Sequence, residues 1–186
     1  TGLLQSDQAR LITIAGLGGT GKTRLAAEAA QTQLHLFPGG VYFVPLAPIQ
    51  KADDMETAVA RTIGLYLTAA DNINERLQTF FRDKPVLLIM DNFEHLEHLE
   101  LGAQWIGNLL DNTQELSIIV TSRSSINISA EWVRHLGGVD FPIRADVEDP
   151  MAYSAIQLFV DRVKHVRAAF SLQAEQTHVI EICRLV

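Results

Sequence analysis

Glycines, one lysine and one threonine are concentrated in residues 16–23, which read GLGGTGKT. Glycines let the backbone turn tightly, so that successive N–H groups can point at one anion. Lys22 adds a cation and Thr23 a hydroxyl, the groups that bind the β/γ-phosphates and the Mg²⁺ of a nucleoside triphosphate. The segment matches the P-loop pattern G-x-x-x-x-G-K-[ST] and predicts a phosphate-binding loop.

Such a loop needs a strand before it and a helix after it, and the flanking residues meet both needs. Residues 11–15 (LITIA) predict a buried strand, and residues 25–30 (LAAEAA) are rich in strong helix formers. The positive N-terminal end of that helix would also attract phosphate. We therefore predict that the nucleotide is bound by Gly16, Gly18, Gly19, Thr20, Gly21, Lys22, Thr23 and Arg24.

The same glycines also fit a dinucleotide fingerprint, G-x-G-x-x-G. That motif expects an acidic residue at the end of the second strand to hold a ribose hydroxyl. Here residues 41–44 (VYFV) run into Pro45-Leu46-Ala47, which contains no acid. Lys22 and Thr23 have no role in a dinucleotide site but a defined role in a triphosphate site. We therefore set the dinucleotide interpretation aside.

Two acidic residues follow the next apolar run. Residues 86–90 (VLLIM) are typical of a strand covered on both faces, and Asp91 comes directly after them. A carboxylate there can hold Mg²⁺ opposite the Thr23 hydroxyl, so Thr23 and Asp91 are the predicted metal residues. The alternative is that Asp91 caps a following helix. Glu94 could polarise the attacking water, or it could be an ordinary acid near a helix start.

A cation follows the strand after that. Residues 116–121 (LSIIVT) predict another buried strand, and Ser122-Arg123 come next. Ligands of parallel α/β sheets bind at the carboxyl ends of the strands, where Arg123 could distinguish a triphosphate from a diphosphate. Glu94 and Arg123 are thus the candidate catalytic residues. The alternative for Arg123 is an ion pair on a loop, independent of phosphate.

The chain as a whole predicts an α/β fold, with a parallel five-stranded sheet flanked by helices. Helices are expected near residues 53–63, 74–82 and 101–110, and a short strand near 139–141 is expected to close the sheet. Beyond Pro150 two helical stripes follow one another without a strand. We therefore predict a nucleotide-binding domain over residues 1–150 and the beginning of a truncated helical subdomain over 151–186.

Composition narrows the class of protein further. The 186 residues carry a net charge of −7 with dispersed acids, which argues against direct nucleic-acid contact by this segment. No apolar run reaches the roughly 18 residues of a membrane span, and the N-terminus does not resemble a signal peptide. The single cysteine, Cys183, excludes an internal disulfide. A cytoplasmic location is expected, and both ends look cut from a longer protein.

Three segments in register carry a family resemblance: the loop 16–23, LLIMDNFEHL at 87–96 and TSR at 121–123. With them the chain resembles the signal-transduction ATPases with numerous domains (STAND), an ASCE-type group of P-loop NTPases. Within that group it looks like the NB-ARC-type ATPase of bacterial SARP and LuxR transcriptional regulators. Residues 155–163 and 180–185 are similar to the helical subdomain that follows the nucleotide domain there.

The resemblance implies a molecular switch that binds ATP or ADP with Mg²⁺. ADP would hold a closed form, and exchange for ATP would open it to activate an effector among the flanking domains or to form a homo-oligomer. Asn92 stands where many NB-ARC proteins have a second Asp, so hydrolysis would depend on Glu94 or be slow. The glycine-arginine and Gly-x-Pro motifs of the family are not found in residues 1–186.

Two other functions remain open at this point. A regulatory module could exchange ADP for ATP without hydrolysing it, which Asn92 favours. A small-molecule P-loop kinase is also conceivable. However, the stretch between Lys22 and Asp91 holds its own strand and helices, and the sequence has no Arg-rich lid.

Overall fold

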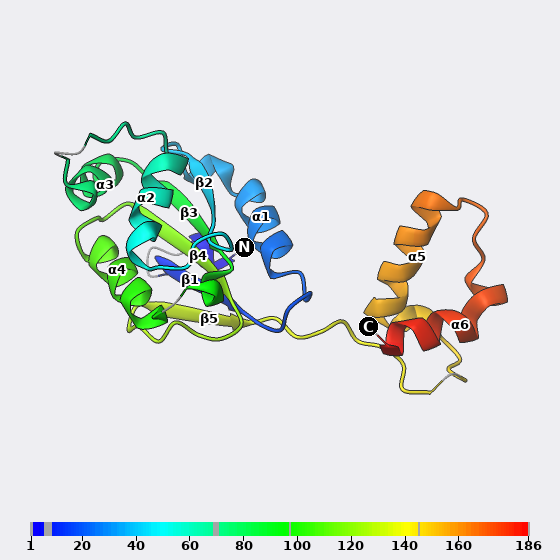
Figure 1. The fold of residues 1–186 in the computed structure, drawn as a ribbon. Coiled ribbons are helices and arrows are strands. Elements are labelled where there is room, and N and C mark those ends of the chain that lie inside the picture. Colours follow the sequence, from blue (N-terminus) through cyan, green and yellow to red (C-terminus); the bar gives the residue numbers. More distant parts are fainter. Residues whose placement is uncertain (1, 6–8, 69–70, 97, 145, 186) are drawn as a thin grey trace. The chain divides into compact units, whose positions relative to one another are not determined.

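The structure is a computed structural model that describes residues 2–5, 9–68, 71–96, 98–144 and 146–185. Contacts divide the chain into two compact units, one up to Leu136 and one from Gly137 on (Figure 1). The sequence pattern joined residues 137–150 to the first domain, whereas the division by contacts places the boundary between Leu136 and Gly137.

The first unit is built on a five-stranded parallel sheet with the strand order β2-β3-β4-β1-β5. Ile118 of β4 lies between Leu11 of β1 and Leu88 of β3. The predicted parallel α/β sheet is thus confirmed. Its strands are β1 (Leu11–Ala15), β2 (Val41–Pro45), β3 (Val86–Asp91), β4 (Leu116–Ser122) and β5 (Glu131–His135).

The prediction for the closing strand was wrong. The sheet ends with β5 rather than with residues 139–141, because EWVRH forms a half-exposed edge strand that lacks a continuous apolar run. Asp140 instead makes backbone hydrogen bonds within the second unit. Its N–H donates to the Ser154 hydroxyl (2.8 Å), and its carbonyl accepts from the Ala155 N–H (2.9 Å).

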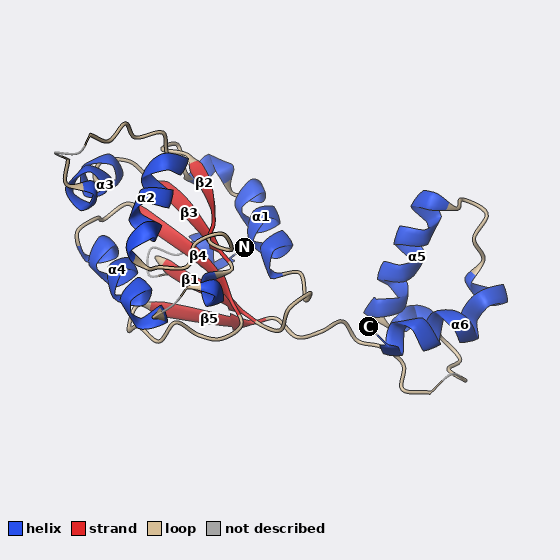
Figure 2. Ribbon diagram, in the orientation of Figure 1, coloured by secondary structure: helices blue, strands red, loops and turns tan. Residues whose placement is uncertain are grey.

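Helices cover both faces of the sheet (Figure 2). One face packs against α1 (Lys22–Thr32), and the other packs against α2 (Asp53–Thr62), α3 (Ile73–Phe81) and α4 (Leu99–Asp111). The three helices expected between residues 53 and 110 are therefore present. Short 3-10 helices are η1 (Gly2–Gln5), η2 (Leu34–Leu36) and η3 (Phe93–His95).

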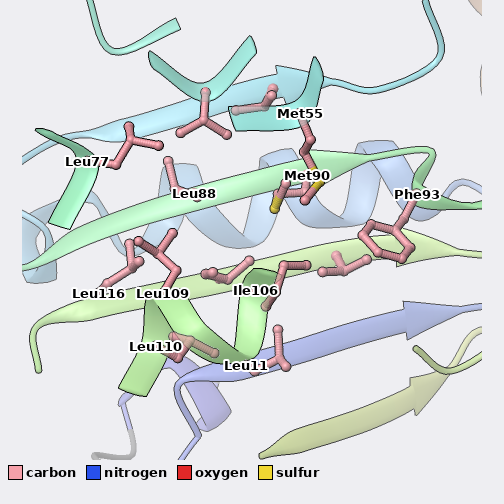
Figure 3. Close-up of a cluster of buried hydrophobic side chains, with 14 of the residues drawn as sticks. Leu11, Met55, Leu77, Leu88, Met90, Phe93, Ile106, Leu109, Leu110 and Leu116 are labelled. Carbon is pink, nitrogen blue, oxygen red and sulfur yellow. The ribbon is translucent and has the colours of Figure 1, made fainter. Parts of the chain in front are cut away.

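Strand β3 shows why a central strand reads as a continuous apolar run. Leu88 and Met90 belong to the core under α2, α3 and α4 (Figure 3), whereas Leu87 and Ile89 belong to the core under α1. Both sets are at most 2% exposed. Because neither face of β3 meets water, every position up to Asp91 is apolar.

Arg10 stabilises the end of the sheet that lies opposite the glycine-rich loop. Its guanidinium donates to the carbonyls of Leu110, Thr113 and Leu116, which lie between the end of α4 and the start of β4. Burial lowers the pKa of Arg10, while nearby Asp111 and Glu115 oppose this shift. The bonds fix α4 and β4 to β1, because Arg10 directly precedes that strand.

The second unit contains η4 (Pro150–Ala152), α5 (Ser154–Val166) and α6 (Leu172–Leu185). Its small core is formed by Ala155, Ile156, Val160, Val179, Ile180 and Cys183. Burial raises the pKa of the Cys183 thiol. The two predicted helical stripes are confirmed as α5 and α6. No helix in the described part of the chain is long and apolar enough to cross a membrane.

Candidate nucleotide-binding site

The strand order brings the predicted site residues to one edge of the sheet. Because β4 lies between β1 and β3, the glycine-rich loop, Asp91 and Ser122 all follow neighbouring strand ends. The Gly16 N–H donates to the Ser122 carbonyl (3.1 Å), which joins the loop to the end of β4. Gly16 and Ser122, which are more than a hundred positions apart in the sequence, therefore lie at one edge of the sheet.

Three glycines of the loop are required for two different reasons. Gly19 and Gly21 have φ values of +80° and +88°, in the left-handed region that favours glycine. Gly16 is instead confined by contact, since a Cβ there would lie 2.5 Å from the Leu136 carbonyl oxygen. The Thr20 hydroxyl donates to the Leu17 carbonyl (2.9 Å) and closes the turn.

Lys22 is buried inside this loop, with 6% of its surface exposed. Its Nζ donates to the carbonyls of Gly16 and Leu17, both at 2.9 Å. A lysine is rarely buried without partners. An ammonium group has three protons, so these two bonds orient the cation and leave one donor for a ligand.

The first turn of α1 is open to an anion. The helix begins at Lys22, and its N-cap, Gly21, makes no side-chain hydrogen bond to the first-turn N–H groups. Thr23 and Arg24 lie on this turn and are exposed, and Gly18 is exposed in the loop before it. A phosphate at this position would meet unpaired N–H groups and the positive end of the helix.

Asp91 is held by three side chains. Its Oδ1 accepts from the hydroxyls of Thr23 and Thr121, both at 2.6 Å, and its Oδ2 accepts from the Asn92 amide (3.1 Å). The carboxylate is 5% exposed. The Thr121 hydroxyl also accepts from the Asn92 N–H (2.9 Å). Asp91 does not cap η3, whose N-cap is Asn92.

The Thr23 hydroxyl and the Asp91 carboxylate fit a magnesium ion chemically. Both offer oxygen, the ligand that Mg²⁺ prefers, and the two groups already lie in contact. Among the described residues, no group of three or more His, Cys, Asp or Glu side chains could hold a metal. Phosphate oxygens and water would therefore complete the coordination, as is usual for Mg²⁺ in nucleotide sites.

Glu94 and Arg123 form an ion pair, with 3.4 Å between Oε1 and Nε. The two side chains differ in exposure: 14% for Glu94 and 67% for Arg123. The second carboxylate oxygen, Oε2, is buried and has no hydrogen-bond partner within the described part of the chain. The sequence patterns treated these residues separately, and the structure brings them together.

Sequence reasoning gave Thr121 no role in the site, although it named the residue as the end of a strand and as part of the TSR segment. Met90 is paired with Val120 in the register of β3 and β4, so Asp91 and Thr121 are the next residues along neighbouring strands. Each also follows an apolar run. That signal is visible in the sequence, but it identifies a pair only once the two strands are known to be neighbours.

A parallel sheet with β4 between β1 and β3, and a glycine-rich loop joining β1 to α1, defines the class of P-loop NTPase domains. A family profile described as "AAA domain" matches residues 5–127, which is more than half of the chain. The chain belongs to this AAA domain family.

Similar proteins include a "putative HTH-type transcriptional regulator" of Mycobacterium tuberculosis, 32% identical over 179 residues. The match covers 95% of this chain and 19% of that protein. An uncharacterized protein of Mycobacterium tuberculosis is 31% identical over 182 residues, with 97% of this chain and 43% of the relative covered. The chain therefore spans less than half of the length of either relative.

Solved structures of other proteins share the fold. Cdc6p from Pyrobaculum aerophilum has a TM-score of 0.61 at 14% identity, over 83% of this chain and 43% of that one. A STAND protein with a tetratricopeptide repeat sensor from Pyrococcus horikoshii has a TM-score of 0.54 at 15% identity. It covers 99% of this chain, which is 27% of its own length.

Proposed function

We propose that this chain binds ATP and ADP with Mg²⁺ and acts as a slowly hydrolysing molecular switch. One observation carries the proposal: the Thr23 hydroxyl, the Asp91 carboxylate and the Thr121 hydroxyl meet beside the loop that buries Lys22. Lys22 would hold the phosphates of a bound triphosphate, Thr23 and Asp91 would hold its metal, and Thr121 would keep the Asp91 carboxylate in position.

Each group has a role in the proposed reaction. Lys22 and the first-turn N–H groups of α1 would hold the β/γ-phosphates, and Thr23 and Asp91 would hold Mg²⁺, which neutralises phosphate charge when bound. Glu94 would orient a water and accept its proton as the water oxygen bonds to the γ-phosphorus. The bond from that phosphorus to the β–γ bridging oxygen would break, releasing phosphate and ADP. Arg123 would contact the γ-phosphate.

The switch would act on an effector in the same protein. A relative that contains a similar segment is named as an HTH-type transcriptional regulator, and this segment covers only 19% of it. The resemblance to STAND and NB-ARC ATPases favours the same arrangement here, with regulation of transcription as the output and nucleotide-dependent self-association as a further step. DNA contact would belong to another domain, since this segment carries a net charge of −7.

A second candidate function is supported by Asn92. Its side chain donates to Asp91 and offers no second carboxylate at the strand end. A module that exchanges ADP for ATP without hydrolysis would need no more than the residues that hold phosphate and metal. The two candidates differ only in whether ATP is turned over.

The proposal is tested by calorimetric titration with ADP and with ATP, each with Mg²⁺. Lys22→Ala is expected to lose binding of both, because a charge-assisted contact worth about 1.5–3 kcal/mol is removed. Lys51→Ala removes an exposed lysine of the same unit and should bind like the unchanged chain. Equal affinity in Lys22→Ala would overturn the phosphate site. Phosphate release above the Lys22→Ala background would favour the hydrolysing switch over the exchange module.

A further inference from the structure

Arg123 is the cation that the proposed function assigns to the γ-phosphate, yet in this structure it is already paired with Glu94. Arg123 follows Ser122, whose carbonyl accepts from the loop residue Gly16, so it starts from the edge of the phosphate site. A single guanidinium would have to leave or share Glu94 in order to contact phosphate. Contact between Arg123 and the γ-phosphate would therefore weaken or break its ion pair with Glu94.

We propose that Glu94 sets the nucleotide preference of this site by competing with the γ-phosphate of ATP for Arg123. The inference rests on the proposed function. It adds that Glu94 weakens the binding of ATP relative to the binding of ADP. ADP has no γ-phosphate and leaves the ion pair intact. ATP must draw Arg123 away, so its binding alone includes the cost of breaking the pair.

Glu94 and Arg123 are not equally free to move, so one of them moves when the ion pair breaks and the other stays in place. Glu94 follows two residues that are held in place: Asn92, whose backbone N–H donates to the Thr121 hydroxyl, and Phe93, which is fully buried in the core. The Glu94 side chain is 14% exposed, whereas the Arg123 side chain is 67% exposed. Arg123 can therefore turn toward a ligand while Glu94 stays in place.

The buried oxygen of Glu94 adds to the modest cost of separating this carboxylate from Arg123. Oε2 has no hydrogen-bond partner among the described residues, and Arg123, which contacts Oε1, is the one cation paired with this carboxylate in the described part of the chain. A buried carboxylate that loses its counter-ion is penalised unless another donor replaces it. A water molecule would supply that donor, and it would then lie beside the γ-phosphate. The same exchange that weakens ATP binding would position the water for hydrolysis.

A double-mutant cycle on the 186-residue chain tests the competition. The affinities of ADP and of the β,γ-imido analogue of ATP, each with Mg²⁺, are measured for the unchanged chain, Glu94→Gln, Arg123→Ala and the double variant. Glu94→Gln is expected to raise the ratio of analogue to ADP affinity by about three- to fivefold, the upper part of the range for one partly exposed ion pair. Arg123→Ala is expected to lower that ratio.

The Arg123→Ala background separates competition from simple charge repulsion. Removing the Glu94 charge would help a triphosphate by repulsion alone, whether or not Arg123 is present. Competition instead predicts that Glu94→Gln raises the ratio much less when Arg123 is absent. An equal rise in both backgrounds would overturn the inference, and so would an unchanged ratio in Glu94→Gln.

Two further comparisons keep the result specific. Glu100→Gln removes an acidic charge at the start of α4, which pairs with His98 rather than with Arg123, and it should leave the ratio unchanged. If the unchanged chain binds neither nucleotide, the proposed function fails together with this inference. If it binds both and the cycle is additive, only the competition fails.

Discussion

Asp91, the last residue of strand β3, and Glu94, which follows the strand, have opposite surroundings. Asp91 accepts three hydrogen bonds from side chains of α1, β4 and its own neighbour Asn92. Glu94 has one exposed cationic partner and one buried oxygen without any partner in the described part of the chain. The difference indicates that the residues proposed to hold the metal are already fixed by hydrogen bonds, whereas the residues proposed to act on the γ-phosphate would have to rearrange on ATP binding.

Polar satisfaction explains why these two parts differ. A buried carboxylate with all its bonds made resists movement, because each displaced bond exposes an uncompensated group. The pair of Glu94 with Arg123 is weaker, since the arginine is largely in water, where an ion pair contributes little. The firmly held Asp91 and the weakly paired Glu94 are thus only three residues apart in the chain.

The largest effect is expected when the charge of Asp91 is removed. In Asp91→Asn, Mg²⁺ is expected to lose most of its effect on ATP affinity, a change of about 10- to 100-fold, because a metal ligand or its close partner is lost. The measurement is titration with ATP in Mg²⁺ and again in EDTA. The variant and the unchanged chain should agree in EDTA. If Mg²⁺ raised the ATP affinity of Asp91→Asn as much as that of the unchanged chain, Asp91 would not be a metal ligand.

A smaller effect is expected when Asp91 keeps its charge but loses its support. Thr121→Val removes a hydroxyl that serves both Asp91 and the Asn92 N–H, which should lower the free energy of unfolding by about 1–2 kcal/mol. Thr121→Ser keeps the hydroxyl and should recover most of that loss. Urea unfolding followed by tryptophan fluorescence reports the first unit, since Trp105 and Trp132 both lie there.

Thr13 provides a matched control for that experiment. It is a fully buried threonine of β1, and its hydroxyl has no hydrogen-bond partner among the residues that the structure describes. Thr13→Val should therefore leave stability unchanged or raise it by up to about 1 kcal/mol. If Thr13→Val and Thr121→Val lost equal stability, the Thr121 hydroxyl would have no special role.

The smallest effect is expected from Glu94→Gln on stability. The charge has one partner that is mostly exposed, so its removal should change the free energy of unfolding by less than about 1 kcal/mol. The same urea experiment measures this value. A loss as large as that of Thr121→Val would show that Glu94 is a structural residue, and the contrast with Asp91 would disappear.

Some features were predictable because they depend on short stretches of chain. The loop 16–23 has its strand and helix on either side, and the apolar run before Asp91 indicates a strand buried on both faces. The fifth strand was not found, because β5 is an edge strand whose polar residues resemble a loop. The placement at residues 139–141 followed from expecting an apolar strand there.

The sequence by itself determined the phosphate loop, the buried central strands and the kinds of side chain that follow them, because these depend on local backbone requirements and on burial. Only the tertiary structure decided that β4 lies between β1 and β3, and hence that Thr121 supports Asp91 and that Arg123 faces Glu94. Neighbouring strands are chosen by the packing of the whole sheet against its helices. No single segment carries that information, so the contacts among strand ends are a property of the folded chain.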